Sequence, residues 1–125
     1  MVVEAFQTVE DRDNPDEVEA IGPFICRRAN AWLGEGYYFW DTNIDWAHEW
    51  GQRGYLNNYI ICQAQVTIDE NCFDLVGNLR HQRELLEIIK VFKESGLLTG
   101  KGNIYLGQLI QLMKNQGIFG YTCIR

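Results

Sequence analysis

The chain has 125 residues, of which 46% are hydrophobic and 22% charged, as in a folded globular protein and unlike disordered or fibrous chains. Its formal net charge is −6, but residues 10–19 alone carry six carboxylates and one arginine, so the remaining chain is almost neutral. Nucleic acid is therefore not an expected partner, because phosphate backbones are bound by clustered lysine and arginine. A signal peptide is not expected, because no basic segment is followed by an apolar one, and no apolar run approaches the 18 residues of a membrane span. The sequence therefore favours a cytoplasmic location.

The first quarter of the chain predicts one strand and several irregular segments. Residues 2–9 alternate in polarity and are rich in β-branched and aromatic side chains, which predicts a strand. The acidic run around Pro15 is interpreted as a solvated loop, the alternative being a loop that docks or gates a protein. Residues 22–28 then read as a short extended piece, and residues 36–41 as a buried aromatic strand.

A short helix and a long strand follow. The helix is predicted over residues 43–52, with Thr42 as N-cap and Asp45 three residues later at the positive end of the helix dipole. Residues 57–68 predict a long strand whose first half is almost wholly apolar. Such a run is typical of a strand covered on both faces, so we expect it to be central in the sheet.

The last part of the chain is mainly helical. Residues 72–76 predict a further short strand, residues 78–95 a helix that stops at Gly96, and residues 103–116 a second helix. The apolar face of the first helix, expected to pack on the sheet, consists of Leu85, Leu86, Ile89 and Phe92. The second helix has its apolar face at Leu106, Leu109, Ile110 and Met113. Residues 120–125 begin or form a last strand, so the element order predicts an α+β fold in a single domain, 1–125.

The cysteines and histidines predict no metal site. The four cysteines lie in apolar or strand-like surroundings and form no CxxC pair: Cys26, Cys62, Cys72 and Cys123. This pattern is typical of reduced thiols inside a cell. His48 and His81 are the only imidazoles and fit no HExxH pattern. Pairing of a histidine with Cys62 or Cys72 as a nucleophile is the alternative to buried structural thiols.

The most informative segment is 31–51, which contains all four tryptophans and two tyrosines around a Gly-x-Gly turn. The glycines allow the backbone to approach a flat ligand. Strand alternation predicts Tyr37 and Phe39 on one face, packed inside, and Tyr38 with Trp40 on the other. The segment is therefore either an aromatic pocket or simply part of the core.

These residues also resemble a known family. Gly34, Gly36, Tyr38 and Phe39, with Ala47 nine residues after Tyr38, look like the G-x-G-x-Y-F...A pattern of the poly(ADP-ribose) polymerase-like catalytic domain. The segment is also similar to small bacterial ADP-ribosyltransferase-like proteins with a WLGxGxYFW sequence. The resemblance is strongest over residues 30–50. It implies a split mixed or antiparallel sheet, with a short helix after the aromatic strand and two longer helices.

The resemblance implies an NAD site. Tyr38 matches the tyrosine that stacks on nicotinamide, and Trp50 is the choice for the aromatic residue that closes the other side. The family's usual position for that residue falls at Glu49, with Trp46 one turn before Trp50. The two glycines, Gly34 and Gly36, would line the same cofactor site.

Two further family elements depart from the pattern. The histidine or arginine of the first strand, which grips ribose and carboxamide, corresponds here to Gln7 with Thr8, which carry no charge. The late-strand glutamate or glutamine that stabilises the transition state is not found, because residues 118–125 contain neither. The domain is therefore expected to lack the C-terminal catalytic strand, and its catalytic residue is unknown. An exposed edge at residues 121–124 would favour homodimerisation.

Three functional hypotheses follow. The first is an NAD-dependent mono-ADP-ribosyltransferase-like domain, such as a toxin, that transfers ADP-ribose to an unknown protein target. The second is a catalytically inactive domain of the same fold that serves as a binding or interaction module. The third is an unrelated small α+β protein whose aromatic side chains are all core.

Overall fold

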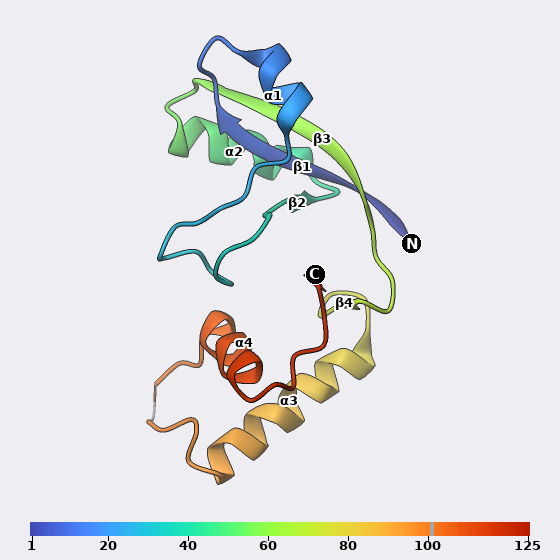
Figure 1. Ribbon diagram of the computed structural model, residues 1–125, viewed down its shortest axis with the longest axis vertical. Coiled ribbons are helices and arrows are strands. Elements are labelled where there is room, and N and C mark those ends of the chain that lie inside the picture. Colours follow the sequence, from blue (N-terminus) through green and yellow to red (C-terminus); the bar gives the residue numbers. More distant parts are fainter. Residues whose placement is uncertain (101) are drawn as a thin grey trace. The chain divides into compact units, whose positions relative to one another are not determined.

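The computed structural model describes residues 1–100 and 102–125. Within these ranges the chain is a mixed α+β protein with four helices, a three-stranded antiparallel sheet and a two-stranded parallel sheet (Figure 1). The predicted α+β class is confirmed. The chain forms two compact units, the first made of residues 1–28 and 35–67 and the second of residues 29–34 and 68–125.

The first unit is built on the antiparallel sheet. Its elements are β1 (Val2–Glu10), α1 (Pro15–Ile21), β2 (Trp40–Asp41), α2 (Ile44–Gly54) and β3 (Tyr59–Thr67). The strands predicted over 2–9 and 57–68 are confirmed, but the expectation that the second is central is wrong, because the strand order is β2–β1–β3. β1 carries four consecutive buried residues, 5–8, whereas the later side chains of β3 alternate with exposed ones. An apolar run thus did not reveal which strand has neighbours on both sides.

Helix α2 packs closely on the sheet, against β1 and β3. Small residues make this approach feasible: Ala47 is fully buried, and a Cβ built on Gly51 would collide with the ring of Tyr59. The predicted helix is confirmed, but its N-cap is Asn43 and not Thr42. The Asn43 side chain accepts the N–H of Asp45 at 3.0 Å, which satisfies a donor that the first helical turn leaves free.

Two other local predictions for this unit are corrected. The acidic run is not all loop, because α1 begins at Pro15, whose fixed φ suits a first helical position, and acidic residues in the first turn favour that end of the helix dipole. The aromatic strand predicted over 36–41 shrinks to β2, in which Trp40 pairs with Phe6 and Asp41 with Ala5.

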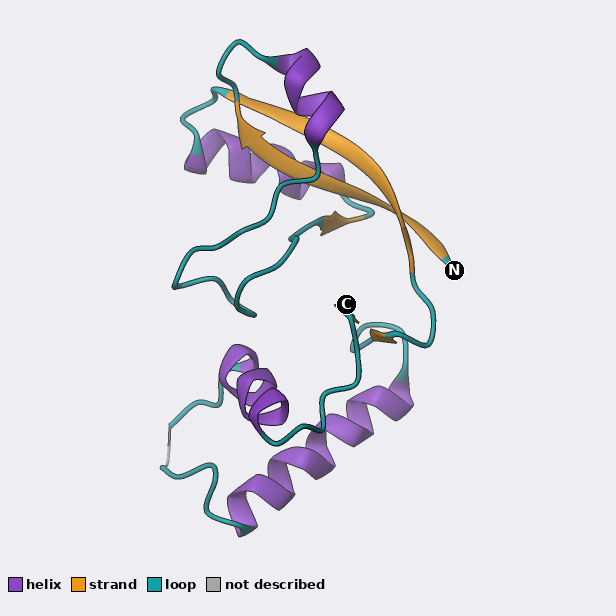
Figure 2. Cartoon of the chain, viewed as in Figure 1, coloured by secondary structure: helices purple, strands orange, loops and turns teal. Residues whose placement is uncertain are grey.

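The second unit consists of two helices and a short parallel sheet. Its elements are β4 (Cys72–Phe73), α3 (Leu79–Glu94), α4 (Leu106–Asn115) and β5 (Cys123–Ile124) (Figure 2). Both predicted helices are confirmed, and both predicted strands are present but shorter than expected. Asn78 caps α3 by accepting the N–H groups of Arg80 and His81.

The core of the second unit lies between the two helices. The buried residues of this cluster are Phe92, Leu109, Ile110 and Met113. Leu85, Ile88 and Ile89 pack against this cluster, so the apolar face of α3 packs on α4. Leu86, expected on that face, is 66% exposed. A position one residue from Leu85 on a helix is turned by about 100°, which brings Leu86 away from the face that Leu85 and Phe92 share.

Candidate functional site

Gln7 uses its side-chain hydrogen bonds within the protein. Its Oε1 accepts the N–H of Phe24 at 2.7 Å, and its Nε2 donates to the carbonyl oxygens of Phe24 at 2.7 Å and of Tyr38 at 3.4 Å. The residue is 8% exposed. Gln7 therefore ties two irregular segments to the central strand. Whether it also contacts NAD stays a prediction.

Thr8 points to the opposite face of β1, as strand alternation requires. Its hydroxyl donates to the carbonyl oxygen of Ala47 at 2.8 Å, and the side chain is 8% exposed. This contact fixes α2 on the sheet.

We expect Thr8→Val to lower the free energy of unfolding by about 1 kcal/mol, because valine keeps the shape but removes the donor to a buried carbonyl. Urea unfolding followed by circular dichroism measures the difference. Thr67→Val, at an exposed position at the end of β3, is the matched control and should change stability by less than about 0.5 kcal/mol. Equal losses in both variants would contradict a specific role for the Thr8 hydroxyl.

The Gly-x-Gly turn is open. Gly34 has a φ of +86°, which glycine adopts without strain, and a Cβ built on either Gly34 or Gly36 would meet no heavy atom within 4 Å. Gly36 exchanges two backbone hydrogen bonds with Cys26, at 2.8 and 3.1 Å. Gly34 belongs to the second unit and Gly36 to the first.

The order of burial expected among the neighbouring aromatic residues is wrong. Tyr37, predicted to be inside, is 56% exposed, whereas Tyr38 and Phe39 are both half-buried. The prediction assumed strand alternation, and residues 37–39 are outside the strand. The nicotinamide-stacking role of Tyr38 stays a prediction.

Three of the four tryptophans gather on the first unit. The rings of Trp40 and Trp46 are nearly parallel, with centroids 6.3 Å apart and planes 20° from each other. Trp50 lies one helical turn after Trp46 and tilts against Trp40 at 6.4 Å and 50°. Trp46 is 54% and Trp50 43% exposed. We call Trp40, Trp46 and Trp50 the tryptophan surface, and its half-exposed rings can receive another flat group.

Carboxylates adjoin each member of this surface in the sequence: Asp41, Asp45 and Glu49. Glu49 forms an i,i+4 ion pair with Arg53, whose guanidinium nitrogen lies 2.6 Å from the carboxylate. Gly54 lies beside Trp50, since a Cβ built there would be 3.4 Å from the indole, in ordinary van der Waals contact. Asp41 and Asp45 are thus sequence neighbours of Trp40 and Trp46, whereas the charge of Glu49 is paired with that of Arg53.

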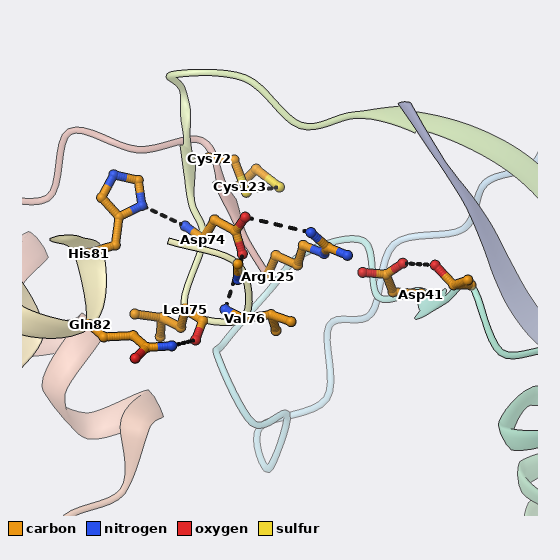
Figure 3. Close-up of polar contacts among 11 residues, drawn as sticks. Asp41, Cys72, Asp74, Leu75, Val76, His81, Gln82, Cys123 and Arg125 are labelled. Carbon is orange, nitrogen blue, oxygen red and sulfur yellow. Dashed lines mark hydrogen bonds and ion pairs between the residues drawn. The ribbon is translucent and has the colours of Figure 1, made fainter. Parts of the chain in front are cut away.

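The second unit contains a polar cluster that sequence reasoning missed (Figure 3). The Asp74 carboxylate accepts the N–H groups of Gly77 at 2.8 Å and Val76 at 3.1 Å, and it lies 3.6 Å from the Arg125 guanidinium. The hydrogen bond from Gly77, aided by Val76 and Arg125, lowers the pKa of Asp74. The Asp74 N–H donates to Nδ1 of His81 at 2.9 Å, so that nitrogen carries no proton. The cluster orders the loop between β4 and α3.

A surface hollow is found in each unit. In the first unit a hollow of about 450 Å³ is bordered by Gln7, Phe39 and Cys62. In the second a hollow of about 720 Å³ lies between residues 30–34 and 105–111, where Trp32 is 77% exposed. Neither hollow includes a member of the tryptophan surface.

Some functional classes find no support in the described residues. Outside position 101, no group of three histidine, cysteine, aspartate or glutamate side chains is arranged to hold a metal ion. None of the helices described is long and apolar enough to cross a membrane. Comparisons with protein families, with curated proteins and with solved structures found no match.

Proposed function

We propose that this protein is a cytoplasmic binding domain that holds the nicotinamide ring of NAD on its tryptophan surface. The observation that carries the proposal is the arrangement of the three indoles, with two nearly parallel rings at 6.3 Å and two half-exposed ones. Isolated tryptophans occur on many surfaces, but here Trp46 and Trp50 both pack on Trp40 and still leave ring faces open, which forms a platform for a planar ligand.

The charge of the surface favours a cationic ring. The nicotinamide ring of NAD is planar and positively charged, and a cation over an indole face gains about 0.5–2 kcal/mol. Asp41 and Asp45, which adjoin Trp40 and Trp46 in the sequence, would add attraction for the same charge. This preference agrees with the resemblance of the segment around Gly34 to NAD-using enzymes.

Binding without efficient transfer is the better-supported form of this function. Gln7 and Thr8 correspond to the residues that bind ribose in the family. Both side chains form hydrogen bonds with backbone groups of the protein itself. Transfer of ADP-ribose to a protein target in an ADP-ribosyltransferase-like fold is the second candidate. The motif around Tyr38 favours it. We also propose dimerisation through residues 121–124. β5 pairs with β4 along one edge, and a strand of a second copy would pair along its other edge.

We expect Trp46→Ala to weaken NAD binding by about 1–3 kcal/mol, the usual loss when a stacking aromatic side chain is removed. Isothermal titration calorimetry measures the affinity. Trp32→Ala is the matched control, because Trp32 is 77% exposed and outside the tryptophan surface. Circular dichroism confirms that both variants are folded.

Three results distinguish the alternatives. ADP-ribose, which lacks the nicotinamide ring, should bind more weakly than NAD. Equal binding of the two compounds, or equal losses in Trp46→Ala and Trp32→Ala, would show that the surface does not recognise nicotinamide. Loss in Tyr38→Ala with full binding in Trp46→Ala would instead place the ring at Tyr38, as in the family that the segment resembles.

A further inference from the structure

Two cysteines far apart in the sequence lie side by side in the second unit. Cys72 in β4 and Cys123 in β5 are register partners in the parallel sheet, and their Sγ atoms are 3.0 Å apart (Figure 3). Neighbouring strands lie about 4.8 Å apart, within the Cα separation of about 4.4–6.8 Å that a disulfide bond spans. All four cysteines of the chain are free thiols in this structure.

Backbone hydrogen bonds between the two strands keep the two cysteines side by side. The N–H of Arg125 donates to the carbonyl of Phe73 at 3.0 Å, and the N–H of Leu75 donates to the carbonyl of Arg125 at 2.7 Å. On the N-terminal side of the two cysteines, the N–H of Thr122 donates to the carbonyl of Asn71 at 2.9 Å. The contact between the thiols therefore follows from strand pairing on both sides of it.

We propose that Cys72 and Cys123 are an oxidation site, at which a small disulfide such as oxidised glutathione converts the two thiols into a reversible disulfide bond. The Cys123 thiol first loses its proton to solvent, and its thiolate attacks one glutathione sulfur. The S–S bond of glutathione breaks, one reduced glutathione leaves, and a mixed disulfide remains on Cys123.

The second step closes the bond. The Cys72 thiol loses its proton, its thiolate attacks the Cys123 sulfur, and the second glutathione leaves in reduced form. The two thiols of the protein are thereby oxidised, and one oxidised glutathione is reduced to two molecules of reduced glutathione.

The surroundings of the two residues set this order. Cys72 is 1% exposed, whereas Cys123 is half-buried and open to an attacking reagent. Burial, with the neighbouring Cys123 thiol, raises the pKa of Cys72 to about 12. A thiol that rarely ionises is a poor first nucleophile. It serves instead as the resolving thiol once Cys123 carries glutathione 3.0 Å away.

The disulfide bond would link β5 covalently to β4. It closes a loop between residues 72 and 123 that contains both helices of the second unit. Cross-linking so long a loop restricts the unfolded chain, and the expected rise in melting temperature is on the order of 10 °C. Reduction would release the strand.

The test exposes the full chain to oxidised glutathione and then blocks free thiols with iodoacetamide. Peptide mapping by mass spectrometry is expected to show a Cys72–Cys123 disulfide that dithiothreitol reverses, with melting temperature raised in the oxidised form. The Cys26→Ser/Cys62→Ser double variant, altered only in the first unit, should form the same bond. Cys123→Ser should form none.

Other products would overturn the proposal. Glutathione retained on Cys123 without closure would show that Cys72 cannot reach it. Disulfides that include Cys26 or Cys62 would show unspecific oxidation. A wild-type chain whose thiols at 72 and 123 both remain open to alkylation after treatment would show that the pair is not an oxidation site.

Discussion

Replacement of Leu109 by alanine is expected to lower the free energy of unfolding by about 2–5 kcal/mol. Leu109 is 1% exposed and belongs to the buried cluster between α3 and α4. Removing its branched end forfeits both the burial of apolar surface and the contacts of atoms that then line a cavity. Guanidinium chloride unfolding, followed by circular dichroism at a helical wavelength, measures the loss.

The matched control is Leu86→Ala on the neighbouring helix. Leu86 is the same residue type in a helix, but it is 66% exposed, so we expect a change below about 0.5 kcal/mol. A loss at Leu86 comparable to that at Leu109 would contradict the packing described for α3. A small loss at Leu109 would mean that the two helices do not form the core of the second unit.

The second large effect concerns catalysis. We expect the 125-residue chain to release nicotinamide from NAD about 10² to 10³ times more slowly than a transferase that carries the late-strand carboxylate, because one well-placed stabilising group contributes a factor of that size. Residues 118–125 contain no carboxylate side chain. The two glutamates of residues 31–51 already have cationic partners, since Glu35 pairs with Arg27 at 3.0 Å and Glu49 with Arg53.

Nicotinamide release by the purified chain, measured by liquid chromatography with and without candidate protein targets, provides the test. Steady release at ordinary enzymatic rates would contradict the expectation. Glu35→Gln and Glu49→Gln would then show which carboxylate carries the reaction, with Glu70→Gln, in the turn before β4, as a matched control. NAD binding without release would agree with a binding domain.

Local sequence determined most of the secondary structure. Helices α3 and α4 follow from apolar spacing of three and four residues, and α3 begins directly after Asn78, whose side chain caps the first turn. Strand β1 follows from alternation over residues 2–9. These signals depend on neighbours within a few residues, so they are readable without knowing the fold.

The candidate site could be predicted only in part, because its side chains meet through tertiary contacts that local sequence does not specify. The density of aromatic residues in 31–51 drew attention to this segment. It did not reveal that Trp46 and Trp50 would meet Trp40 rather than the core, because that depends on how α2 lies beside β2. Alternation failed at Tyr37 because pairing with Phe6 begins only at Trp40.

Only the tertiary structure decided which partners distant in sequence each side chain would meet. A buried polar group must find a hydrogen-bond partner, but composition does not say which, so the bonds of Gln7 to Phe24 and Tyr38 could not be foreseen. The pairing of Cys72 with Cys123, 51 residues apart, depends on β5 returning beside β4. Likewise, Leu85 and Leu86 are adjacent leucines about 100° apart on one helix, and the position of α4 determined which of the two directions is buried, so Leu85 packs against the core and Leu86 is 66% exposed.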